Sequence, residues 1–214
     1  MPVRRLSKFK LLAILAILTI AAALAPTVIA MASDEPAYSV ELKDGDFEIR
    51  RYEPLLAAEV TVGGERSAAI SQGFRMLADF IFGNNTSKTR IEMTAPVTQQ
   101  PSEKIAMTVP VTQQASGNEW KVRFIMPAQY TAETLPVPNN TAVRIVAEPP
   151  KRFAVIRFSG WSSEANLAEH RDLLVAWVKS KALPAAGPPV AAFYNPPWSL
   201  PFLRRNEYLI ELTG

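Results

Sequence analysis

The sequence Ile91-Glu-Met-Thr-Ala-Pro-Val-Thr-Gln-Gln100 recurs almost unchanged, four residues later, as Ile105-Ala-Met-Thr-Val-Pro-Val-Thr-Gln-Gln114. Apolar and polar residues alternate through each copy, which predicts two half-buried strands joined by a polar turn over residues 101–104. A proline cannot donate a ladder hydrogen bond, so Pro96 and Pro110 are expected at a sheet edge, a strand end or a bulge.

Met93 and Met107 take equivalent places on the apolar faces of these two predicted strands. Both side chains are therefore expected to reach one apolar interior. Thioethers suit the irregular wall of a site for a flat apolar ligand, and they suit an ordinary hydrophobic core equally well. Both interpretations stay open at this point.

The N-terminal segment, residues 1–32, has the organisation of an export signal. Four basic residues precede an apolar run over residues 11–25, and Ala30-Met31-Ala32 has the small-residue pattern of a cleavage site. A signal peptide cleaved after Ala32 is favoured; the alternative is an uncleaved membrane anchor, because the apolar stretch is long enough to span a bilayer. Either way the remainder is expected to be exported, periplasmic or anchored to the outer face of the inner membrane, with membrane contact only through residues 1–32.

Net charge and cysteine content exclude several classes of function. The formal charge is +3, and removing residues 1–32 takes away four positive charges and no negative ones, which leaves −1. The basic character thus belongs to the export segment and gives no argument for nucleic-acid binding. The absence of cysteine excludes disulfides and thiolate chemistry. Residues 33–214 are long enough to form a single domain with its own core.

Two segments with helical spacing of apolar residues divide the rest of the chain into similar halves. Helices are expected over residues 65–82 and 164–182, the second capped by Ser162 or Ser163. Besides the two repeat copies, strands are expected over residues 47–52, 55–62, 120–126, 141–147, 153–158 and 206–212. In each half a strand leads through glycine into a helix, which predicts two related β-α-β-β units in one α+β domain.

Most catalytic arrangements fail because the chain has a single histidine, His170. A catalytic triad or a His-pair metal site therefore cannot form in the usual way, and no enzyme is expected. His170 falls on the apolar face of the second helix. A neutral imidazole there can ligate haem iron, or it can be a hydrogen-bonded core residue.

A proline-stiffened aromatic segment, Phe193-Tyr-Asn-Pro-Pro-Trp-Ser-Leu-Pro-Phe-Leu-Arg-Arg205, precedes the last predicted strand. Its prolines exclude regular structure, so Trp198 is presented by a loop. Its aromatic residues can cover a porphyrin face while Arg204 or Arg205 pairs with the propionates, or they can form a lid over the end of the core.

Three motifs together resemble the SOUL haem-binding protein family. These are the duplicated Ile-x-Met-Thr-x-Pro-Val, Trp120-x-Val-x-Phe-x-Met-Pro127, and Tyr194-Asn-Pro-Pro-Trp-x-Leu-Pro-Phe-x-Arg-Arg-Asn-Glu207. The resemblance covers residues 38–212. It implies a distorted antiparallel β-barrel of two related halves flanked by two helices, and non-enzymatic binding of haem or another tetrapyrrole.

The resemblance also implies where the ligand lies. The family's apolar pocket, between the first helix and the loop before the last strand, corresponds here to Phe74, Arg75 and Leu77 on one side and Tyr194 and Trp198 on the other. Some members carry an iron-ligating histidine just before the tyrosine of the early strand, where this sequence has Arg51. Haem would then be held non-covalently by apolar burial, with Arg51 or Arg75 on a propionate.

The sequence thus predicts a haem or tetrapyrrole carrier or scavenger of the cell envelope. The alternative is an envelope module that binds another apolar small molecule or a protein partner.

Overall fold

The computed structural model describes residues 35–88 and 102–214, within a compact unit that spans Ser33–Gly214. Its elements, in chain order, are β1 (Tyr38–Asp44), β2 (Phe47–Tyr52), β3 (Leu55–Gly63), α2 (Arg66–Ile81), β4 (Asn85–Thr86), β5 (Val111–Ser116), β6 (Glu119–Ile125), β7 (Val137–Pro138), β8 (Arg144–Glu148), β9 (Lys151–Phe158), α3 (Glu164–Ser180), β10 (Val190–Phe193), the short helix η1 (Pro201–Leu203) and β11 (Asn206–Leu212). None of the helices in these described ranges is long and apolar enough to cross a membrane.

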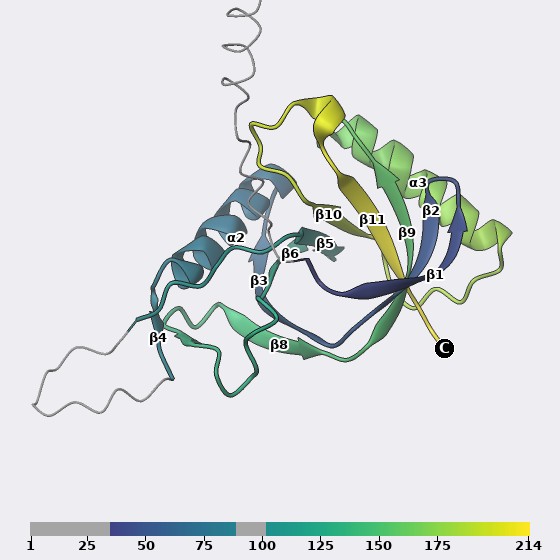
Figure 1. Cartoon of the computed structure of the whole chain (residues 1–214). Coiled ribbons are helices and arrows are strands. Elements are labelled where there is room, and N and C mark those ends of the chain that lie inside the picture. The colour runs from purple at the N-terminus through teal and green to yellow at the C-terminus, as the bar shows by residue number, and fades with distance from the viewer. Residues whose placement is uncertain (1–34, 89–101) are drawn as a thin grey trace, which may run out of the picture. The chain divides into compact units, whose positions relative to one another are not determined.

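An antiparallel sheet of nine strands, in the order β1-β2-β9-β11-β10-β5-β6-β3-β8, curls into a half-barrel (Figure 1), and β4 pairs with β7 in a separate two-stranded sheet. Helix α2 packs on β3 and β6, and α3 packs on β9 and β11. The predicted α+β class, the distorted barrel and the two flanking helices are confirmed. Both helix starts are capped as their sequences require: the Glu65 carboxylate accepts from the N–H groups of Ser67 and Ala68, and the Ser163 hydroxyl accepts from that of Asn166.

The two predicted halves are present, and they exchange a strand. In β3-α2-β5-β6 and in β9-α3-β10-β11 the last strand lies between the other two, and the halves join where β5 pairs with β10. Strand β2 precedes β3 in the sequence but pairs with β9, whereas β8 precedes β9 but pairs with β3. Each half therefore completes the sheet of the other.

The predicted hairpin of the repeat is wrong for its second copy, because only its last residues form a strand, β5. Ahead of β5, Ile105 is buried and donates its N–H to the carbonyl of Ile81 at 2.8 Å, and the Thr108 hydroxyl bonds the carbonyl of Ile125. Met107 is 42% exposed and does not reach an interior. Pro110 lies immediately before β5, in agreement with a strand end. The first copy, with Met93 and Pro96, lies outside the described residues.

The sheet has two differently used faces because side chains alternate along each strand. In β9, Ala154, Ile156 and Phe158 face α3, whereas Val155 faces the opposite side and packs with Tyr52 and Tyr194. The helix face therefore carries two cores, one under each helix, and the inner face of the half-barrel carries a third, smaller cluster.

Gly73 marks the closest approach of α2 to the sheet. A Cβ at this position would lie 2.7 Å from Cγ2 of Val122 and 3.1 Å from Cγ2 of Val60, both fully buried. We expect Gly73→Ala to lower the free energy of unfolding by about 1–3 kcal/mol, because overpacking outweighs the gain in helix propensity. Urea denaturation measures the change, with the exposed Gln72→Ala as the matched control expected to be neutral or stabilising. A stabilised Gly73→Ala variant would show that the helix can move away from the sheet.

Candidate functional site

The residues of α2 assigned to a ligand pocket do not all point the same way. The ring of Phe74 is 39% exposed and meets Phe124 edge-on at a centroid distance of 5.1 Å. Arg75 is exposed, without an ion pair to any other described residue. Leu77 has no exposed surface and belongs to the core between α2, β3 and β6. One side of α2 thus offers an aromatic ring and a guanidinium to solvent.

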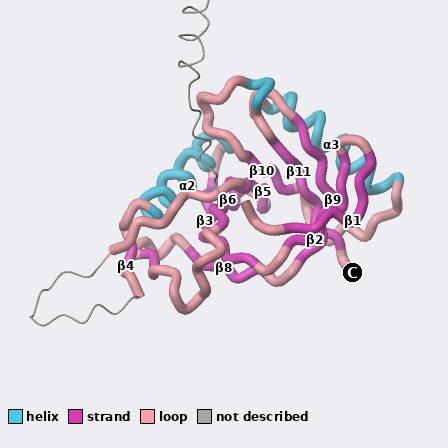
Figure 2. Tube along the Cα trace, viewed as in Figure 1, coloured by secondary structure: helices cyan, strands magenta, loops and turns pink. Residues whose placement is uncertain are grey.

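The loop between β10 and β11 contains the short helical turn η1 (Figure 2). Its large apolar side chains are exposed to solvent. Trp198 is 83% exposed and Phe202 is 71% exposed, as the loop prediction for Trp198 requires. We call the whole set the aromatic loop surface; it consists of Trp161, Trp198, Leu200, Phe202 and Leu203.

Hydrogen bonds hold this loop in place. Gly160 N–H donates to the carbonyl of Pro201 at 2.9 Å, and Arg204 Nε donates to the carbonyl of Ser199 at 2.9 Å. The Arg204 guanidinium also lies 4.4 Å from the ring centroid of Trp161, just before α3. Arg66, the first residue of α2, pairs with Glu164, the first of α3, at 2.9 Å. The aromatic loop surface therefore lies at the end of the molecule where both helices begin.

His170 lies on α3 with both its ring face and one nitrogen engaged. Its Nδ1 is 2.8 Å from the carbonyl of Asn166, and its ring stacks on Phe158 at 4.1 Å. Phe158 and Phe124 sit in one cross-sheet row, β9 to β6 through β11, β10 and β5, so four strand spacings, about 19 Å, separate them. His170 and Phe74, which contact the two ends of that row, are not brought together.

Tyr194 and Arg51 also lie apart from the α2 residues. Tyr194 is buried on the inner face of the half-barrel, opposite the helices. Arg51 is exposed at the side of the sheet, where its Nε donates to Glu41 at 2.8 Å. The strand neighbour Arg50 points to the other face and is 2% exposed.

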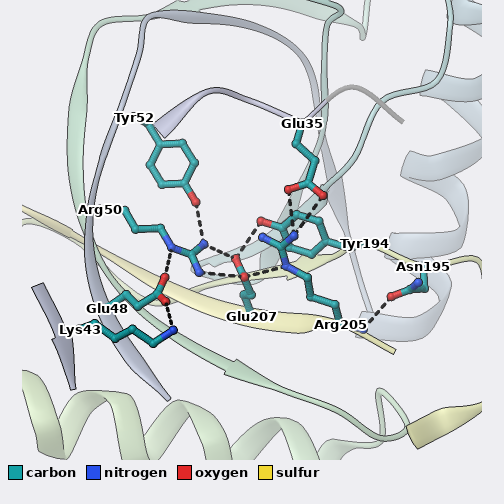
Figure 3. Close-up of polar contacts among 9 residues, drawn as sticks. All are labelled: Glu35, Lys43, Glu48, Arg50, Tyr52, Tyr194, Asn195, Arg205 and Glu207. Atoms are coloured by element: carbon teal, nitrogen blue, oxygen red, sulfur yellow. Dashed lines mark hydrogen bonds and ion pairs between the residues drawn. The ribbon is translucent and has the colours of Figure 1, made fainter. Parts of the chain in front are cut away.

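A buried ionic network centred on Glu207 occupies the inner face (Figure 3). The Glu207 carboxylate has no exposed surface and accepts two hydrogen bonds from Arg50, at 2.8 and 3.1 Å. It accepts a third from the Tyr194 hydroxyl at 2.8 Å and a fourth from Arg205 Nε at 2.9 Å. Arg50 also donates to the Tyr52 hydroxyl at 3.2 Å. The buried carboxylate is thus fully compensated.

The pKa values of Arg50 and of the two tyrosine hydroxyls are raised within the network. Burial alone would lower the pKa of Arg50, but the hydrogen bonds and the negative charge of Glu207 outweigh it and raise that pKa. Burial, reinforced by Glu207, raises the pKa of the Tyr194 hydroxyl. Burial likewise raises the pKa of Tyr52 to about 12. Arg50 therefore stays protonated and both tyrosine hydroxyls stay neutral at neutral pH, so these three side chains hold the strands of the inner face together by hydrogen bonds and charge.

A cleft opens beside this network on the inner face. Its first part has a volume of about 190 Å³ and is walled partly by Tyr52, Phe153 and Tyr194. A neighbouring hollow of about 480 Å³ shares Glu53 and Leu55 with it. We call the two together the inner cleft. Within residues 35–88 and 102–214, no cluster of His, Asp and Glu side chains could hold a metal ion.

The network and the cleft were missed by sequence reasoning. The signal that could have found them is a charged residue that strand alternation places on the same face as an apolar or aromatic neighbour, as it places Arg50 with Tyr52 in β2 and Glu207 with Leu209 in β11. Such residues are rarely buried without a partner, so each predicts an opposite charge elsewhere in the fold.

The curled antiparallel sheet with two helices on one face defines a class of α+β folds, and comparisons with known proteins give the family within it. The model of the SOUL heme-binding protein family matches residues 33–211. The chain belongs to this family, as its motifs predicted. No curated protein matches the chain.

Solved structures share the fold at low identity. The C-terminal domain of EcmrR has a TM-score of 0.55 at 10% identity, covering 83% of this chain and 98% of that one. EcmrR in a complex with DNA has a TM-score of 0.50 at 9% identity, covering 78% and 57%. These similarities concern the fold alone.

Proposed function

We propose that this protein binds haem or a related tetrapyrrole without covalent attachment, as a carrier or scavenger in the cell envelope, and catalyses no reaction on it. Membership of a haem-binding family supports the ligand class. The export segment in residues 1–32 supports the location, with cleavage after Ala32 as the favoured route. The single observation that carries the proposal is the aromatic loop surface.

The exposed residues fit a flat apolar ligand with carboxylate arms. Contiguous apolar surface of this kind is unusual on a soluble domain and marks a binding site. Trp198 and Phe202 offer rings for stacking on a macrocycle, and the exposed Arg75 and Phe74 of α2 offer a propionate partner and a further apolar contact. When bound, haem would supply an iron centre whose ligation these residues do not provide.

A haem titration of residues 33–214 tests the proposal. We expect a Soret shift at micromolar haem, and at least a tenfold weaker affinity in the double variant Trp198→Ala and Phe202→Ala, because stacking contributes about 1 kcal/mol or more per ring. Phe82→Ala is the matched control, since Phe82 is 61% exposed at the far end of α2. Absence of any Soret shift, or equal losses in both variants, overturns the proposal.

His170 is expected to be structural in this complex. We predict that His170→Ala leaves the Soret maximum and the haem affinity unchanged and lowers the free energy of unfolding by about 1 kcal/mol, through loss of the stack on Phe158. Absorbance spectra of the ferric complex and urea denaturation give the two readouts. A variant whose Soret band moves by several nanometres while stability holds would make His170 the iron ligand.

A further inference from the structure

The inner cleft is separate from the aromatic loop surface and is chemically unlike it. Tyr52, Phe153 and Tyr194 supply aromatic walls, and Leu55, Ile125 and Leu209 supply aliphatic ones. Tyr52 and Tyr194 are held by the Glu207 network behind them, so the aromatic walls are preformed. The cleft is therefore a built cavity, of a size that admits a small organic molecule.

Acidic residues outnumber basic ones in the lining of the cleft. The smaller hollow holds Glu53, Glu148 and Glu211 against Arg123 and Lys151. The acids of the larger hollow are Glu35, Glu53 and Glu148, and of these Glu35 is paired with Arg205, outside the lining, at 2.8 Å. Apolar walls strengthen the field of these charges at any bound ligand.

Both cations of the cleft are already neutralised by its acids. Lys151 Nζ lies 2.7 Å from Glu148 and 3.1 Å from Glu211, and Arg123 lies 3.2 Å from Glu148. Arg123 also pairs with Glu59 behind the lining. Glu53 is different: it borders both hollows, it is exposed, and it has no side-chain partner within the described ranges. Its backbone N–H donates to the carbonyl of Ala37 at 3.0 Å, which fixes the backbone of Glu53 at the junction of the two hollows.

We infer that the inner cleft is a second binding site, for a small organic cation that carries an aromatic or branched apolar group. The cationic centre lies between Glu53 and the aromatic rings, which attract it through charge and through cation–π contact. The apolar group fills the space beside Ile125 and Leu209. An anionic tetrapyrrole is repelled by the same carboxylates, so this site is independent of haem binding.

Benzyltrimethylammonium tests the inference by isothermal titration calorimetry on the protein as processed by its host, with neutral benzyl alcohol and anionic phenylacetate as matched probes. We expect saturable binding of the cation, at least tenfold weaker binding of benzyl alcohol and none of phenylacetate. NMR methyl signals of Leu55, Ile125 and Leu209 should shift on titration, and those of Leu77 should not.

Glu53→Gln should weaken binding of the cation about three- to tenfold, which is the range expected for the loss of one solvent-screened charge at contact distance. Glu169→Gln, an exposed acid on α3, should leave it unchanged. No binding of the cation, equal binding of the neutral probe, preference for phenylacetate or an unaffected Glu53→Gln variant each overturns the inference. Haem titrations test the aromatic loop surface and not the inner cleft, so either proposal can be overturned while the other stands.

Discussion

Replacing Glu207 with alanine should lower the free energy of unfolding by about 3–5 kcal/mol, a large part of the stability of a domain of this size. The substitution removes the acceptor of four hydrogen bonds and leaves Arg50, which is 2% exposed, with Glu48 as its remaining acidic partner among the described residues. Arg205 would keep Glu35 as its acidic partner, and it already has one buried nitrogen without a partner in the described part of the chain. Urea denaturation followed by circular dichroism measures the loss.

Two further variants keep this prediction testable if Glu207→Ala fails to fold. Glu207→Gln preserves the shape of the side chain, so the stability that it loses measures the contribution of the charge. This loss should be smaller than the loss in Glu207→Ala. Glu41→Ala breaks an exposed pair with Arg51 and should cost less than 1 kcal/mol. A Glu207→Ala variant as stable as Glu41→Ala would mean that water enters the network and screens it.

The sequence predicts those parts of this fold that depend on local spacing. Apolar alternation identifies the strand around Phe153, and the three- and four-residue spacing around Leu174 identifies α3 within two residues of its observed end. The exchange of β2 and β8 between the halves has no local signature, because it depends on which distant edges pair. The repeat shows the opposite case. Its alternation around Met107 predicts a strand, but Ile105 bonds to the end of α2 and the strand begins only after Pro110.

The candidate sites also divide into a part that local sequence predicts and a part that depends on distant pairing. Exposure of Trp198 follows from the prolines that surround it, so the aromatic loop surface could be predicted. Arg50 and Glu207 are 157 positions apart, and Arg50 looked equivalent to its neighbour Arg51 until the sheet fixed which of the two points inward. Burial of a charge is decided by tertiary register, and a shift of one residue would have exchanged the two arginines.

Replacing Leu77 with alanine should lower stability without weakening haem binding, because Leu77 belongs to the core under α2 and not to its exposed surface. Leu77 has no exposed surface and packs with Phe80, Ile81 and Phe124 in the core under α2. Truncating it leaves a cavity, and we expect a loss of about 2–5 kcal/mol in the free energy of unfolding. Haem affinity, measured by Soret titration well below the unfolding temperature, should stay within twofold of the unchanged protein.

Phe74→Ala is the matched comparison, because Phe74 is one helical turn away and 39% exposed. It should lose less stability than Leu77→Ala, since part of its ring is already in water, and it should weaken haem binding more. The reverse pattern, with haem binding lost and stability kept in Leu77→Ala, would place the ligand inside the core of α2. Haem binding would then depend on the buried side of α2 and not on its exposed surface.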